Sequence, residues 1–370
     1  MAPPQGLAPS TRTLLFLSAA VIVLAGVHAT REVLAPLFLA AVLVIIVHPI
    51  RHPLEHRGWH RAAATTVVIA VVYLILLVLV AMLVFAGVQF AGLVQEYLQD
   101  LQDAVGSATS WLATLGLDEE AVSSATDALQ PSQLLGVATT ISGAVVGVAS
   151  TLFVVVSYVI FMAVDAARYD GAHVQFGATQ GGVLRRATTF NIGVRRYFVV
   201  SASFGAVVAV IDGIALWLLG VPAPAVWAIL AFVTNFIPNI GFVIGVIPPT
   251  IMALVVGGWP LALAVIAVYS AVNVVLQVLV QPKFVADAVN ITLTLSFVSV
   301  IFWTFVIGPL GAILAVPLTL LMRAVLLQGP PETAWYSWLS GEDVPKPDRS
   351  PDPSPDPEPE PVVVERPAAD

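Results

Sequence analysis

Long apolar runs separated by short polar loops dominate this chain. Eight hydrophobic segments recur, at about 14–29, 33–50, 62–94, 134–164, 197–219, 225–256, 260–280 and 291–326. An apolar helix needs roughly 20 residues to cross the bilayer's hydrocarbon core of about 30 Å. The pattern therefore predicts an all-α polytopic membrane protein with about eight apolar segments.

Two of these runs are interrupted near their midpoints by proline and glycine. FIPNIG at 236–241 breaks the segment 225–256, and GPLG at 308–311 breaks the segment 291–326. Backbone freed inside a membrane must line a cavity or be buried in protein, and paired broken segments point to a transporter's substrate site. Each half has roughly 13–17 residues, short for a full span. This favours two re-entrant hairpins that open from opposite faces, with two long kinked crossings as the alternative.

Loop charges set the orientation. Five arginines lie in 166–196 and three in 51–61, whereas 95–133 holds seven acids and neither Lys nor Arg. The positive-inside rule places the two basic loops in the cytoplasm and the acidic one outside, with both termini cytoplasmic. Within 95–133, apolar residues recur at helical spacing, which predicts a surface amphipathic helix or an extension of the third span.

Composition agrees with the membrane assignment. Hydrophobic residues make up 58% of the chain and charged residues 10%, against about 25% charged in soluble domains. Cysteine is absent, which excludes disulfides and thiolate chemistry. From 341 to 370, nine acids oppose three basic residues, so this stretch supplies −6 of the net charge of −8. Its alternation of Pro with Asp or Glu predicts a disordered tail.

The predicted organisation has seven parts. They are an N-terminal tail (1–12), transmembrane segments 1–3 (13–94), an acidic extracytoplasmic helical insert (95–133), segment 4 (134–165), a cytoplasmic amphipathic connection of short helices (166–196), segments 5–8 (197–326) and a Pro-rich acidic cytoplasmic tail (327–370). The run at 14–29 resembles a signal peptide. Because a second run begins at Val33, we interpret 14–29 as a retained helix, with cleavage as the alternative.

No residue pattern predicts catalysis, a cofactor, a metal site or a nucleic-acid partner. His52, His56 and His60 have metal-like spacing, because residues four apart share a helix face, but they lie in a basic loop and are interpreted as interfacial polar residues.

Asp212 is the most informative single polar residue, because it lies within the fifth span. An ionisable residue at that depth is a functional hypothesis by default, here proton or sodium coupling. The alternatives are a protonated aspartic acid bonded across a helix interface and an aspartate close enough to the outer surface to be hydrated.

Amides form the second polar cluster. Asn273, Gln277 and Gln281 are spaced by four, which places them in one slanted stripe that either joins helices or lines a polar path. Asn235 and Asn239 flank the Pro238 break, where they either face a solute or cap helix ends. The predicted transport pathway comprises Asn235, Pro238, Asn239, Gly241, Asn273, Gln277, Gln281, Gly308, Pro309 and Gly311, with Asp212 for ion coupling.

Several stretches together resemble the autoinducer-2 exporter family. They are FIPNIGFVIGVIPP at 236–249, GPLGAILAVPL at 308–318, LVQPK at 279–283, the lead-in LGVPAPAVWAILAF and Asp165 after the fourth run. The resemblance covers about residues 12–326. It departs from the family pattern at Leu276 and Gln277, where many members carry an acidic residue and glycine, and at Leu293, where many carry proline. One hypothesis is that Asp212 substitutes for the missing acid.

The resemblance implies a bacterial inner-membrane protein that exports small polar solutes, including autoinducer-2. It also implies a homo-oligomer, by family resemblance a pentamer, and in some members sodium/proton exchange. The leading hypothesis is a secondary transporter of a small polar or amphipathic solute, with Asp212 as the candidate for coupling to H⁺ or Na⁺. The alternatives are a sodium/proton exchanger and a non-transporting, channel-like membrane scaffold.

Overall fold

The structure is a computed structural model that describes residues 9–97, 99–100, 151–166, 168–169, 171–281 and 291–326. Within these ranges the chain is helical and contains no strand. The elements are α1 (Pro9–Ala29), α2 (Arg31–Val47), η1 (His48–Ile50), α3 (Arg51–His56), α4 (Arg61–Glu96), the helix Thr151–Ala166, α8 (Ala172–Leu218), α9 (Pro224–Thr234), α10 (Gly241–Asn273), η2 (Val274–Val280), α12 (Leu293–Ile307) and α13 (Pro309–Leu326).

Four stretches of helix are long and apolar enough to cross a membrane. They are Arg31–His56, Arg61–Glu96, Gln175–Leu218 and Gly241–Val280. Helix α4 has 36 residues, so it extends for about 54 Å, well beyond the hydrocarbon core. Apolar side chains such as Leu74, Leu77 and Val88 are exposed along it. In a membrane, such a face contacts lipid rather than water.

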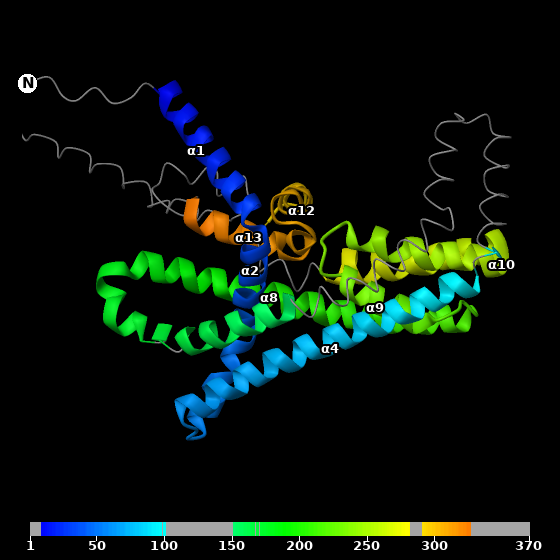
Figure 1. Cartoon of the computed structure of the whole chain (residues 1–370), viewed down its shortest axis with the longest axis horizontal. Coiled ribbons are helices and arrows are strands. Elements are labelled where there is room, and N and C mark those ends of the chain that lie inside the picture. Colours follow the sequence, from blue (N-terminus) through cyan, green and yellow to red (C-terminus); the bar gives the residue numbers. More distant parts are fainter. Residues whose placement is uncertain are drawn as a thin grey trace, which may run out of the picture.

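Helices α2, α4 and Thr151–Ala166 pack into one hydrophobic core. Val44 and Val47 of α2 meet Val68 and Val72 of α4, and Val155 and Val159 contribute from the third helix. The Tyr73 hydroxyl also donates to the carbonyl of Val156 at 3.4 Å. Figure 1 shows α4 running onward beside α9, where Leu93 joins a second core.

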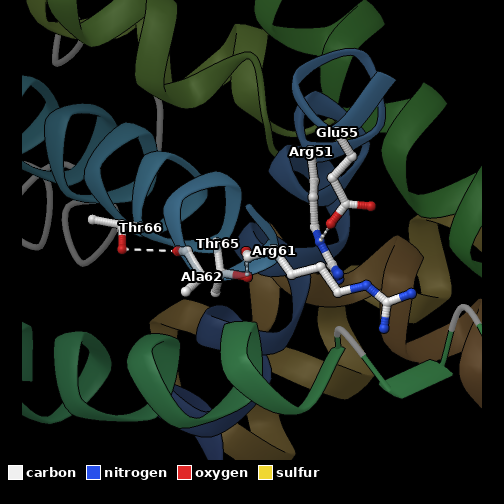
Figure 2. Close-up of polar contacts among 6 residues, drawn as sticks. All are labelled: Arg51, Glu55, Arg61, Ala62, Thr65 and Thr66. Atoms are coloured by element: carbon white, nitrogen blue, oxygen red, sulfur yellow. Dashed lines mark hydrogen bonds and ion pairs between the residues drawn. The ribbon is translucent and has the colours of Figure 1, made fainter. Parts of the chain in front are cut away.

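The turn after α3 separates the three histidines of the 51–61 loop. Arg51 is buried and its Nε donates to Glu55 at 2.6 Å, while the hydroxyls of Thr65 and Thr66 bond to carbonyls in the first turn of α4 (Figure 2). Helix α3 ends at His56, and Gly58 has a φ of 86°. Because His60 lies beyond this turn, the three histidines do not share the helix face that their spacing suggested.

The break predicted at 236–241 is present and reverses the chain. Helix α9 ends at Thr234, Asn239 adopts a φ of 62°, and α10 begins at Gly241. A Cβ on Gly241 would overlap the carbonyl oxygen of Thr234, and one on Gly245 would lie 3.9 Å from the Cα of Ala231. The start of α10 therefore runs back along α9 as a helical hairpin.

Helix α10 is itself folded at Gly258, whose φ of 66° and ψ of −165° are not helical. Gly245 and Asn273 line the same small cavity although 28 residues separate them. A straight helix would hold them about 42 Å apart. The two halves of α10, up to Gly257 and from Trp259, thus lie side by side and antiparallel.

The second predicted break, at 308–311, also makes a hairpin. Helix α12 ends at Ile307, Gly308 has a φ of 81°, and α13 begins at Pro309. The indole nitrogen of Trp303 donates to the hydroxyl of Thr319 at 3.0 Å, although a straight helix would separate these residues by about 24 Å. Both broken segments are therefore helical hairpins rather than kinked rods.

Other predicted parts differ or lie outside the described residues. The connection 166–196 was expected to form short helices. Within α8, two helices meet at a kink at Gln180, so a short helix does begin at Ala172, whereas the second helix continues from the connection into the fifth span. The acidic insert beyond residue 100, the first part of segment 4 and the tail 327–370 lie outside the described residues.

Candidate transport site

Small residues bring α8 and α9 into close contact. A Cβ on Gly213 would lie 3.0 Å from the Cβ of Ala228, so glycine permits an approach that a larger residue would prevent. Asp212 precedes this contact and is fully buried. The close packing therefore places an ionisable side chain among apolar helices.

Asp212 faces a cavity of about 10 Å³ between α8, α9, α10 and η2. Its lining residues are Val208, Asp212, Ala231, Thr234, Asn235, Phe242, Gly245, Tyr269, Asn273 and Gln277. A space of this size accommodates about one water-sized particle. The cavity is thus large enough for a water molecule or a small ion and too small for an organic solute.

Four oxygen atoms at this cavity lack a hydrogen-bond partner among the described residues. They are both carboxylate oxygens of Asp212, the hydroxyl of Tyr269 and the amide oxygen of Asn273. Buried polar atoms are nearly always paired, because an unpaired one costs about 1–3 kcal/mol. Neither Lys nor Arg lines the cavity. This cluster of oxygens therefore has the chemistry of a site for a cation or a proton.

The two other amides at the cavity are already paired. Gln277 Nε2 donates to Asn235 Oδ1 at 2.7 Å, and Asn235 Nδ2 donates to the carbonyl of Ser201 at 2.8 Å. Asn273 uses its nitrogen on the carbonyl of Tyr269 at 3.0 Å, which leaves its oxygen for the cavity. Gln277 lies in η2, a π-helical turn, and such turns are frequent at functional sites.

The structure brings together four of the residues singled out from the sequence, namely Asp212, Asn235, Asn273 and Gln277. Pro238, Asn239 and Gly241 lie in or next to the α9–α10 turn, and Gln281 follows η2; these four do not line the cavity. Gly308, Pro309 and Gly311 belong to the separate α12–α13 hairpin.

Sequence reasoning missed Thr234 and Tyr269. Tyr269 lies four residues before Asn273, so the amide stripe extends one turn earlier than the amides themselves indicated. A tyrosine in an apolar run resembles an ordinary core aromatic, and only its burial beside Asp212 reveals its place. Thr234 is the last residue of α9, where a hydroxyl is easily interpreted as a helix-end residue.

A large apolar groove lies on the other side of the α8–α9 contact. It has a volume of about 850 Å³ and is lined by apolar residues of α4, α8 and α9, including Met82, Trp217 and Phe232. Gly213 lines this groove while the adjacent Asp212 lines the polar cavity. Helices α8 and α9 therefore separate an apolar space from a polar one.

The helical hairpins, the apolar spans and the buried polar cavity together define a multi-pass membrane protein of the transporter class. The chain belongs to the AI-2E family of transporters, which it matches over residues 17–330. This membership places it among transport proteins rather than enzymes.

Several known protein sequences are similar to this chain over most of their length. AI-2 transport protein TqsA of Escherichia coli (strain K12) is 26% identical over 320 residues, covering 86% of this chain and 92% of TqsA. YhhT of the same strain is 28% identical over 334 residues, covering 86% and 91% of the two chains. A Haemophilus influenzae protein is 27% identical over 344 residues, covering 90% and 96%.

Proposed function

We propose that this protein is a secondary transporter that exports a small polar or amphipathic solute across a bacterial inner membrane, with transport coupled to H⁺ or Na⁺ at Asp212. Membership of the AI-2E family and the similarity to TqsA support a solute of the autoinducer-2 kind. The cavity around Asp212 supports the coupling to a small ion.

The observation that carries the proposal is the set of unpaired oxygens around Asp212. Two carboxylate oxygens, one amide oxygen and one hydroxyl converge on a space of about 10 Å³. Hard cations such as Na⁺ prefer oxygen ligands, and a buried aspartate is also a typical proton carrier in transporters. Because the cavity is ion-sized, the solute binds elsewhere and Asp212 serves coupling.

In the proposed arrangement the two hairpins enter the membrane from opposite faces. Helix α9 has 11 residues and extends for only about 16 Å, so it reaches the middle of the bilayer but does not cross it. The α9–α10 hairpin would open outward, α10 after Gly258 would return to the cytoplasm, and α12–α13 would open inward. Eight apolar segments, cytoplasmic termini and a homo-oligomer, by family resemblance a pentamer, complete this proposal.

The pathway would follow the two hairpin turns. Asn239 and Pro309 are exposed at the α9–α10 and α12–α13 turns. In other transporters, the turns of broken helices lie at the solute site. Asn239 and Pro238 at one turn, and Gly308 and Pro309 at the other, are the residues proposed to meet the solute.

A sodium/proton exchanger without an organic solute is the second candidate. The size of the Asp212 cavity favours it, because an exchanger needs a site for a small ion only. The two candidates share Asp212 and differ in whether autoinducer-2 moves.

Purified protein in sealed vesicles tests both candidates. Uptake of autoinducer-2 and of ²²Na⁺ would be measured with an imposed pH gradient, for the wild type, Asp212→Asn and the exposed control Asp100→Asn. We expect the Asp212→Asn variant to lose coupled flux by about tenfold or more while Asp100→Asn transports normally. Unchanged flux in Asp212→Asn would refute the coupling role. Sodium/proton exchange without autoinducer-2 flux would establish the second candidate.

A further inference from the structure

A chain of two hydrogen bonds joins three helices beside the Asp212 cavity. Gln277 in η2 donates to Asn235 after α9, and Asn235 donates to the carbonyl of Ser201 in α8. Ser201 is 1% exposed. Because a carbonyl only accepts, the Asn235 nitrogen must face Ser201 and its oxygen must face Gln277. Asn235 is thus bonded through both its amide oxygen and its amide nitrogen, and Gln277 is bonded through its nitrogen.

Gly205 holds Asn235 in this orientation. A Cβ on Gly205 would lie 2.9 Å from Asn235 Nδ2 and 3.1 Å from its Cβ. Asn235 therefore rests directly on the backbone of α8, one turn beyond Ser201. Such close support leaves the side chain little rotational freedom.

The other end of this hydrogen-bond chain lies in a π-helical element. Gln281 N–H donates to the carbonyl of Leu276, five residues earlier, at 2.7 Å, which is the hydrogen-bond pattern of a π-helix. If η2 changed to the ordinary α-helical hydrogen-bond pattern, its turn would no longer contain the extra residue of a π-helix. Side chains in and after it would then rotate by up to about 100°, which would separate Gln277 from Asn235.

We propose that Asn235 and Gln277 are positioning residues that hold η2 in its π-helical form and so keep the Asp212 cavity closed. Gln277 of η2 lines the cavity together with Asn273, so a change of register in η2 moves Gln277 out of the cavity wall. Release of the Gln277–Asn235 bond is the step that admits an ion to Asp212. This inference rests on the proposed coupling role of Asp212 and assigns the opening motion to one local element with two discrete forms.

Cysteine labelling measures the opening directly, because the chain contains no native cysteine. Val208 lines the cavity and is 2% exposed. In a Val208→Cys background, Gln277→Met removes the donor at nearly constant volume. Gln281→Met is the matched control, because the Gln281 side chain makes no hydrogen bond to any described residue. The probe is 2-aminoethyl methanethiosulfonate, a small water-soluble cation.

We expect Gln277→Met to speed labelling at position 208 by about three- to tenfold, the change that follows loss of one net hydrogen bond, while Gln281→Met leaves the rate unchanged. Equal rates in the two variants would overturn the proposal. If Gln277→Met does not fold, Asn235→Ser removes the same acceptor with a smaller side chain and is held to the same outcome. Labelling requires no transport, so a failure here is distinct from a failure of Asp212→Asn to alter flux.

Discussion

Asp212 of α8 and Tyr269 of α10 line one buried cavity, yet the carboxylate and the hydroxyl are not hydrogen-bonded to each other. Two buried polar groups that line the same cavity would be expected to form a hydrogen bond if stability alone had shaped the site. Under the proposed coupling role, both groups bind a third particle, which is the coupling ion.

The first prediction is that Tyr269→Phe separates stability from transport. Since the hydroxyl makes no hydrogen bond among the described residues, its removal should change the free energy of unfolding by less than about 1 kcal/mol. If the hydroxyl binds the coupling ion, the ion concentration for half-maximal flux should rise about fivefold or more. Thermal unfolding in detergent and ion-dependent flux in vesicles measure the two effects. A large loss of stability with unaltered ion dependence would contradict this.

The second prediction concerns the glycines that close the two hairpins. A Cβ on Gly241 would overlap the carbonyl oxygen of Thr234, and one on Gly311 would overlap that of Trp303. Alanine at either position must push the paired helices apart, so we expect a loss of stability of about 2–4 kcal/mol or failure to fold. Thermal melting of the purified variants measures this.

Gly92→Ala is the control for these hairpin variants. Gly92 lies within α4, and among the described residues no atom beyond its own helix is within 4 Å of a Cβ built there. Alanine is favoured over glycine by about 0.5–1 kcal/mol in a helix interior. Gly92→Ala should therefore melt at the same temperature as the wild type or higher. If Gly241→Ala or Gly311→Ala unfolds at the same temperature as Gly92→Ala, the hairpins tolerate a wider separation of their paired helices.

Much of the fold follows from local pattern. The apolar runs predicted the long helices, and the Pro and Gly clusters predicted both chain reversals, because these residues disrupt helices whatever surrounds them. By contrast, the continuity of α8 through Arg195 and Arg196 was not predicted. Basic residues suggested a surface connection, and local charge says nothing about whether a helix continues through it.

The candidate site was predicted in part for a similar reason. Asp212 is conspicuous because a charged residue in an apolar span is costly. Its partners depend on how three antiparallel helices face each other, which is a matter of tertiary packing. Asn273 and Gln277 of the amide stripe both line the cavity, but spacing alone did not show that Gln277 donates to Asn235 while the Asn273 oxygen is unpaired among the described residues.

The third prediction tests whether the hairpins open from opposite faces. Single cysteines would replace Asn239 and Pro309, which are exposed at the two turns. Gly311 is unsuitable, because any side chain there meets Trp303. A membrane-impermeant maleimide should label position 239 from outside and position 309 from the cytoplasmic side. Labelling of both positions from one face would contradict the opposed arrangement.

The last prediction disturbs Asn235 from a different helix. Gly205→Ala introduces a Cβ 2.9 Å from Asn235 Nδ2, so either the bond to Ser201 or the one to Gln277 must lengthen. In the Val208→Cys background we expect labelling to accelerate by about three- to tenfold, as for Gln277→Met. Gly182→Ala, also in α8, should have no effect, because no atom in the described part of the chain other than its own helix lies within 4 Å of the added Cβ.

The double variant distinguishes one shared mechanism from two separate ones. If Gly205→Ala and Gln277→Met act on the same hydrogen-bond chain, the second substitution has nothing left to release, and their combination should label no faster than either alone. If each merely loosens its own helix, the two accelerations should multiply. Multiplying rates would show that Asn235 does not transmit the effect of η2, because independent sites contribute additively to the free energy of opening.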